Sequence, residues 1–263
     1  MKKSNLLNSL ILATLAVPGV AMAADAPAVT SNIGLVSNYL YRGISQTGGK
    51  PALQGGFDYA HASGFYAGLW GSNVSWLSGL GASSASLELD TYAGFKGGFA
   101  GDFSYDVGYL RYNYPGVYPS TMAAGLAKAD TDEIYGAIGW KWITLKYSHS
   151  LGDTFGVDAA GGTSYVELNA SYSLADSGVT LGAHYGKQTY KGTSADALET
   201  AGTTATYSDY KLSASKDFSG YVVGLAYSKT NAKSGGFYTI TQADGSKSDL
   251  GKGTAVLSLT HAM

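Results

Sequence analysis

The chain has 263 residues, a formal net charge of −2 and no cysteine, and only 14% of its residues are charged. The lack of cysteine excludes a disulfide scaffold, and the lack of any block of basic residues indicates that nucleic acid is not a partner. Glycine reaches 37 residues and tyrosine 21. This composition favours a β-rich chain with many turns over a helical enzyme.

The N-terminus has the features of a secretory signal peptide. Lys2 and Lys3 precede the apolar run "LLNSLILATLAV", and "AMA" at 21–23 fits a cleavage site. The alternative is a membrane anchor, but the run is shorter than the roughly 20 residues that a spanning helix needs. We therefore expect a signal peptide over 1–23 and one domain over 24–263, outside the cytoplasm.

The first predicted strand, 31–42, alternates apolar and polar residues. Its apolar side consists of Ile33, Leu35, Tyr39 and Tyr41. Its polar side includes Asn32, Asn38 and Arg42. A strand with this period of two has one face suited to an apolar medium and one suited to water.

The same alternation recurs along the chain and predicts about twelve strands, with ten or fourteen as alternatives. After the first, we expect strands over 51–61, 64–75, 85–96, 102–113, 132–140, 142–149, 164–174, 178–188, 206–216, 220–229 and 253–263. An all-β chain with a single antiparallel sheet is the expected fold class.

The connections between these strands alternate between long and short. Short joins such as "HASG" and "DFSG" follow long segments such as 115–131, 190–205 and 230–252. In an up-and-down transmembrane β-barrel of the bacterial outer membrane, short turns face the periplasm and longer loops face outward. A soluble β-sandwich, the alternative, has no reason to separate its loops by length. We therefore expect a barrel with both termini on the periplasmic side.

A closed barrel explains the two-sided strands, because it satisfies every backbone amide in hydrocarbon and leaves no sheet edge. Leu89, Leu168 and Leu225 are expected to face acyl chains. Aromatic side chains are expected in the girdles at the two membrane surfaces, namely Tyr39, Tyr41, Tyr59, Tyr109 and Trp140.

Several segments resemble the TorF family of porins from Gram-negative bacteria. The resemblance rests on "SNIGLVSNYLYRGISQTGGKPALQGGFDYAHASGFYAGLWGSNVSW" and continues through "LELDTYAGFKG", "YDVGYLRYNYPG" and "VELNASYSL". It covers nearly all of the chain after the signal peptide. It implies an outer-membrane location and a channel role, and it supplies no catalytic or solute-binding residues.

The polar faces of the strands predict the residues that line a pore. They are Asn38, Arg42, Asp58, Glu88, Asp90, Asp106, Glu133, Lys146, Glu167, His184, Asp209 and Lys211. Together with Lys96, the inward face has seven acids and four bases. An open lumen of this charge is expected to favour cations weakly.

The residues do not predict an enzyme. His149 and Ser150 are adjacent on one strand, so their side chains point to opposite faces and cannot form a dyad. His184 points inward without a recognisable nucleophile. Glu88 and Asp90 form an inward carboxylate pair, which we interpret as part of an ion-pair network with Arg42, Lys96, Lys146 or Lys211. A cation site or acid–base pair is the alternative, and no metal or cofactor site is predicted.

The sequence thus predicts an outer-membrane porin-like channel for passive diffusion of small hydrophilic solutes. A non-conducting structural or surface-binding barrel is the main alternative, and an outer-membrane hydrolase is a weaker one. The expected partners are outer-membrane lipid, lipopolysaccharide, the barrel-assembly machinery during biogenesis and small hydrophilic solutes.

Overall fold

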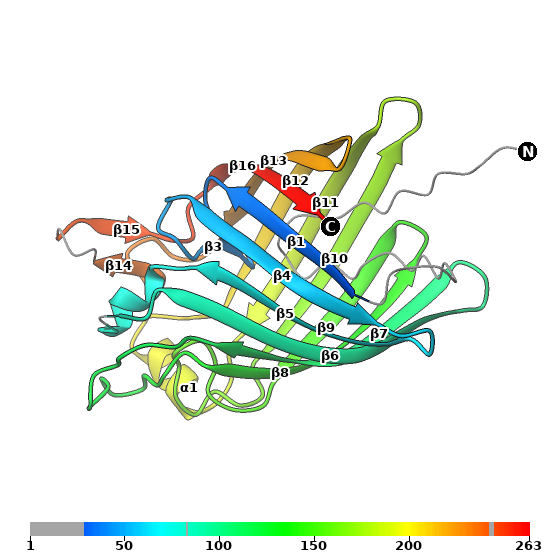
Figure 1. Ribbon diagram of the computed structural model, residues 1–263. Coiled ribbons are helices and arrows are strands. Elements are labelled where there is room, and N and C mark those ends of the chain that lie inside the picture. Colours follow the sequence, from blue (N-terminus) through cyan, green and yellow to red (C-terminus); the bar gives the residue numbers. More distant parts are fainter. Residues whose placement is uncertain (1–28, 83, 242–244) are drawn as a thin grey trace, which may run out of the picture.

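The computed structural model describes residues 29–82, 84–241 and 245–263. Within these residues the chain forms one closed antiparallel barrel of twelve strands (Figure 1). The predicted fold class is therefore confirmed. The predicted signal peptide, 1–23, lies outside the described residues. No helix of the described part is long and apolar enough to cross a membrane.

The wall strands follow one another around the barrel in chain order, and the last closes on the first. They are β1 (Val29–Val36), β4 (Ala52–Ala60), β5 (Phe65–Asn73), β6 (Leu87–Phe99), β7 (Phe103–Asn113), β8 (Thr131–Trp140), β9 (Ile143–Ser150), β10 (Ser164–Leu174), β11 (Val179–Thr189), β12 (Tyr207–Phe218), β13 (Tyr221–Thr230) and β16 (Thr254–Ala262). Apart from the C-terminal end of the first strand, each predicted boundary is correct to within three residues.

The closing pair is β1 with β16, in the register Ile33 to His261 and Val36 to Ser258. Ser31 and Met263 extend it by exchanging backbone hydrogen bonds of 2.9 and 2.8 Å. No wall strand is thus left with a free edge, which is the condition for a sheet to sit in hydrocarbon.

The connections divide between the two ends of the barrel as the sequence predicts. Five short ones, such as 61–64 and 219–220, lie at what we call the turn end. Six long ones lie at the loop end, which also carries the 3-10 helix η1 (Trp76–Leu80), α1 (Thr193–Thr200), β14 (Thr239–Thr241) and β15 (Lys247–Asp249) (Figure 1). The described ends of the chain both lie at the turn end, because Val29 pairs with Tyr59 and His261 with Tyr221.

The outer surface of the wall is apolar. Leu168 is 49% exposed and Leu225 is 59% exposed, whereas Glu167 and Asn169, the neighbours of Leu168 along β10, point inward. Aromatic side chains surround the turn end on this surface, including Tyr59, Phe99, Phe103, Trp140, Trp142, Tyr172, Phe218 and Tyr221. Others lie towards the loop end, including Tyr147, Tyr185, Tyr210 and Tyr227. An apolar band between aromatic belts is the lipid-facing surface of a membrane barrel.

This division between the faces predicts how a charge is tolerated in the membrane. Leu168→Arg, on the outer face of β10, should lower the free energy of unfolding by about 2–4 kcal/mol near the membrane midplane. Ser171→Arg, on the inner face of the same strand, is the matched control and should cost much less, because water solvates it. Urea unfolding of the protein in lipid vesicles measures both. Equal losses would contradict the lipid–water division.

Candidate functional site

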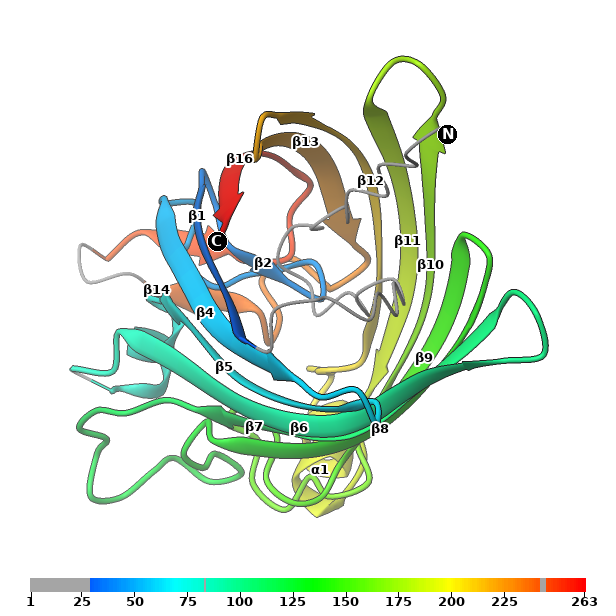
Figure 2. The same cartoon turned by 45° about the vertical axis from the view of Figure 1, so that its right-hand side comes forward.

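The first wall strand ends earlier than the sequence predicts. β1 stops at Val36, and Ser37 makes the last contacts with β16, through Leu257 (2.8 and 3.0 Å). The chain then turns into the barrel, where β2 (Leu40–Tyr41) and β3 (Ile44–Ser45) pair with each other (Figure 2). The prediction of one strand over 31–42 is therefore wrong. We call residues 38–47 the lumen hairpin.

The tip of the lumen hairpin is a two-residue turn. Arg42 has φ 46° and Gly43 has φ 76°, and positive φ at both positions is the mark of the type I′ turn. A Cβ on Gly43 would lie 2.7 Å from Asp209 Cβ and 2.7 Å from Thr230 Cγ2. Both the turn and its close approach to β12 and β13 therefore favour glycine here.

Side chains at the base hold the lumen hairpin together. Ser45 Oγ donates to Asn38 Oδ1 at 2.6 Å, and the Tyr39 amide donates to Thr47 Oγ1 at 3.2 Å. The Gln46 amide adds a backbone bond to the Tyr39 carbonyl at 2.8 Å. These short-range polar bonds replace the wall hydrogen bonds that the segment gives up on leaving the sheet.

Arg42 fastens the tip to the opposite wall. Its Nη1 and Nη2 donate to Glu133 Oε1 and Oε2 at 3.0 and 2.8 Å, and Nη1 also donates to Gln188 Oε1 at 2.8 Å. The guanidinium lies 4.3 Å from the Tyr165 ring centroid and 4.9 Å from that of Tyr41. Bidentate carboxylate bonds with aromatic faces make this a strong, oriented contact.

Two of the four tyrosines predicted for the membrane girdles, Tyr39 and Tyr41, lie inside the barrel instead. Tyr39 is 3% exposed, and its hydroxyl donates to Glu88 Oε1 at 2.9 Å. Tyr41 shares a hydrogen bond with Tyr112 (2.5 Å). The alternation of the sequence continues through these positions, but the backbone that carries it has left the wall.

Glu88 and Asp90 are buried near Tyr39. Glu88 Oε2 and Asp90 Oδ1 have no hydrogen-bond partner among the described residues. Tyr114, which follows β7, has a raised pKa because of its burial and the charges of these two carboxylates, so it stays protonated. The predicted pairing of the two carboxylates with Arg42 is wrong, because Arg42 pairs with Glu133.

Two of the three lysines proposed for that network, Lys96 and Lys146, lie over aromatic rings. Lys96 Nζ lies 5.1 Å from the Tyr66 ring centroid, and Lys146 Nζ lies 4.1 Å from that of Tyr135. Tyr66 hydrogen-bonds both Asp106 (2.6 Å) and Tyr135. These contacts line the lumen between the lumen hairpin and the turn end.

His184 is the centre of a second polar cluster. Its Nδ1 lies 2.7 Å from Asn169 Oδ1, and its Nε2 lies 2.9 Å from Asp209 Oδ1 and 3.0 Å from the Tyr165 hydroxyl. Tyr165 also donates to Asp209 Oδ2 at 2.8 Å. Among the described residues, the hydrogen-bond partners of His184 therefore include no serine. The Ser150 hydroxyl donates a hydrogen bond to Glu133 Oε1 at 3.4 Å.

The structure places all twelve residues of the predicted pore lining inside the barrel. Ten are buried: Asn38, Arg42, Glu88, Asp90, Asp106, Glu133, Lys146, Glu167, His184 and Asp209. Asp58 and Lys211 are half-buried. Asn38 and Arg42 belong to the lumen hairpin, and the others belong to the wall.

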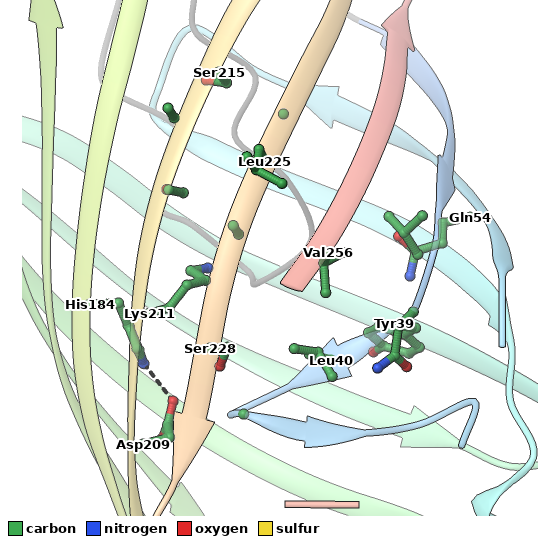
Figure 3. A pocket seen from close by; sticks show the side chains of 17 residues that line it. Tyr39, Leu40, Gln54, His184, Asp209, Lys211, Ser215, Leu225, Ser228 and Val256 are labelled. Atoms are coloured by element: carbon green, nitrogen blue, oxygen red, sulfur yellow. Dashed lines mark hydrogen bonds and ion pairs between the residues drawn. The ribbon is translucent and has the colours of Figure 1, made fainter. Parts of the chain in front are cut away.

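A cavity of about 80 Å³ is lined by the lumen hairpin on one side and by β1, β12, β13 and β16 on the other (Figure 3). It has room for several water molecules. Polar side chains from both sides line it, including Gln54, His184, Asp209, Lys211 and Ser228. A smaller cavity of about 20 Å³ adjoins Arg42, Tyr112 and Tyr165.

Sequence reasoning missed the partners of Arg42. Gln188 and Tyr165 lie on predicted inner faces, but nothing in the strand pattern showed what they would meet. The dipeptide Arg42–Gly43 was the available signal, because X-Gly between two short apolar runs is typical of a two-residue hairpin turn.

A family of bacterial proteins described as of unknown function, Gcw_chp, matches residues 20–263. The chain belongs to this family. The resemblance to the TorF family stays a prediction, and no curated protein matches the chain.

Solved structures with similar folds include outer-membrane channels. An outer membrane channel from Pseudomonas putida is 13% identical, with a TM-score of 0.51, and the match covers 94% of this chain and 98% of that one. The KdgM porin, solved with disordered oligogalacturonate, is 7% identical, with a TM-score of 0.47 and coverage of 89% and 97%. At 13% identity, the likeness to the Pseudomonas putida channel shows the fold alone, that of an outer-membrane barrel.

Because Arg42 and Glu133 form a buried ion pair, substitutions of the two residues should change the free energy of unfolding non-additively. Arg42→Met leaves a buried carboxylate without its cation and should cost about 3–5 kcal/mol of unfolding free energy, whereas Arg42→Met with Glu133→Met should recover part of that loss. Lys141→Met is the control, since Lys141 faces Asp102 at 3.8 Å in an exposed turn and should cost at most about 1 kcal/mol. Urea unfolding in vesicles gives the values, and additive losses would show that the pair is not coupled.

Proposed function

We propose that the protein is an outer-membrane channel through which small hydrophilic solutes diffuse passively. The observation that carries this proposal is the two-sided wall. A closed ring of twelve strands is apolar outside, and its inner face holds the charged side chains. A barrel without an aqueous task has no need to keep so many ionisable groups in its interior, where each one is costly unless it is solvated or paired.

The lumen hairpin gives this channel its constriction. It crosses the lumen from β1 to β8, so solutes pass beside it, along the cavity against β12 and β13. Inside that cavity, width and then local charge decide what passes. The outer-membrane lipid, lipopolysaccharide, the assembly machinery and small solutes are the partners that this role requires.

One observation favours a second function, a non-conducting structural or surface-binding barrel. The tip of the lumen hairpin is buried and held by a bidentate ion pair, as a permanent plug would be. A hydrolase is less well supported, since His184 is engaged by Tyr165, Asn169 and Asp209.

Conductance in a planar bilayer tests the proposed function. The refolded protein should give small, stepwise currents, and a variant with the lumen hairpin, 38–47, replaced by a short Gly-Ser linker should give larger ones, because the lumen is then wider. Currents from the variant alone would support the plugged barrel. If neither protein conducted, both being correctly folded, passive diffusion would be excluded.

The inner face also predicts a weak preference for cations. Its seven acids outnumber its four bases, and the Arg42–Glu133 pair cancels without changing that excess. Low-dielectric walls strengthen the bias, and salt screens it over a Debye length of about 10 Å at 0.1 M.

Glu88 and Asp90 should contribute to this preference because each keeps a carboxylate oxygen without a partner. Glu88→Gln with Asp90→Asn should move the reversal potential in a salt gradient towards zero. Asp102→Asn, in an exposed short turn, is the control and should leave it unchanged. A pore that prefers anions, or one that the double substitution does not alter, would contradict this assignment.

We further propose that the turn end faces the periplasm and the loop end the cell exterior, because short turns lie on the periplasmic side of such barrels. An epitope inserted at 202–203, after α1, should bind antibody on intact cells. An epitope in the short turn 61–64 should bind only after the outer membrane is permeabilised. The reverse pattern would invert the orientation.

A further inference from the structure

The partners of Arg42 on the wall are arranged for a guanidinium group rather than for any cation. Glu133 comes from β8, Tyr165 from β10 and Gln188 from β11, and these three side chains are 1%, 1% and 2% exposed. Two carboxylate oxygens and one amide oxygen meet the edge of the planar group, and an aromatic ring lies over its face. An ammonium ion, which is a compact point charge, cannot match this planar pattern.

The wall itself holds these three side chains in place. The Gln188 amide nitrogen donates to the Ser164 carbonyl at 3.3 Å, which turns its oxygen towards the guanidinium. The Tyr165 hydroxyl bonds Asp209 at 2.8 Å, which fixes the ring. Glu133 also accepts a bond from Ser150 at 3.4 Å. None of these three contacts comes from the lumen hairpin.

The choice of residue at the tip fits the same chemistry. The chain has 17 basic residues, of which only Arg42 and Arg111 are arginine. Arg111 lies at the loop end, where it pairs with Asp132 at 2.7 Å and is 39% exposed. Of the two, only Arg42 meets a buried, bidentate carboxylate. A lysine would supply the same charge at this place without the two parallel bonds.

We propose that Glu133, Gln188 and Tyr165 form a guanidinium-binding site on the barrel wall, which Arg42 occupies as an internal ligand and which a guanidinium-bearing solute occupies when Arg42 is absent. The ligand class is a small cation with a planar guanidinium group. A guanidinium compound binds this site whether or not the barrel conducts. Only the further step, that the permeating solute carries such a group, rests on the proposed function.

The tether explains why a free solute does not simply replace Arg42. A group held by a short chain acts at an effective concentration of about millimolar or more. A free guanidinium compound must exceed that concentration to compete in the wild-type protein. Removing the Arg42 side chain takes away the competitor and leaves the wall site intact.

The test uses the full chain with Arg42→Ala, and methylguanidinium as the probe. Methylguanidinium at millimolar concentration should raise the unfolding temperature of the variant and reduce its current in a planar bilayer. Methylammonium, the control cation, should need a concentration at least about tenfold higher for the same effect, because it cannot form the bidentate contact. Wild type should respond to neither at these concentrations.

A second variant separates this site from a general effect of the salt. Arg42→Ala with Glu133→Gln lacks the bidentate carboxylate and should lose the response to methylguanidinium. If the single variant responded equally to both cations, or the double variant kept its response, the site would be disproved.

The two readouts keep this inference separate from the proposed function. Currents without a methylguanidinium response would overturn the binding site and leave the channel standing. A rise in unfolding temperature without any current would support the site and count against the channel.

Discussion

The structure depends on one constraint: a sheet in hydrocarbon must satisfy every backbone amide and carbonyl within itself. The pairing of β1 with both β4 and β16 meets this constraint by closing the ring. Closure gives each wall strand one face towards lipid and one towards the lumen. The apolar outer band, the aromatic belts and the polar interior all follow from it.

Closure also determines what the chain can do after Val36. Where the segment leaves the sheet, its backbone needs new partners, and the segment turns into the polar lumen. The lumen hairpin supplies some of these partners itself, since the Tyr39 amide donates to Thr47 Oγ1 and the Gln46 amide donates to the Tyr39 carbonyl. The Ser45 amide donates to the Leu250 carbonyl, and the Arg42 side chain makes the contact with Glu133 on the opposite wall.

The charges of the lumen are buried groups, so their pairing matters more than their number. A buried ion pair gains little over an apolar contact, but losing one member leaves a costly charge behind. The contact between Arg42 and Glu133 is therefore better understood as a device that specifies where the lumen hairpin sits. Glu88 and Asp90 are the opposite case, because each buries one carboxyl oxygen that has no hydrogen-bond partner among the described residues.

The sequence predicted the wall well because the wall repeats one rule. Leu168 faces outward and Glu167 inward for the same reason that Leu145 and Lys146 do on the next strand. The rule failed at Tyr39 and Tyr41, where alternation continues but the backbone has left the sheet. The position of Arg42 depends on long-range contacts with Glu133 and Gln188, 91 and 146 residues away. A local residue pattern carries no information about contacts between residues so far apart in the sequence.

An introduced disulfide tests whether the lumen hairpin crosses the barrel in the native membrane. The chain has no cysteine, so an introduced pair reacts alone. An ideal Cβ on Gly43 would lie 2.7 Å from Asp209 Cβ, and a shift of about 1 Å brings the two to the 3.5–4.5 Å of a disulfide.

The measurement is the extent of oxidation in isolated outer membranes, read as a mobility shift on a non-reducing gel. Gly43→Cys with Asp209→Cys should cross-link, whereas Gly49→Cys with Asp209→Cys should not, because Gly49 has open space around it. Failure of the first pair, or equal cross-linking of both, would contradict a lumen hairpin seated against β12.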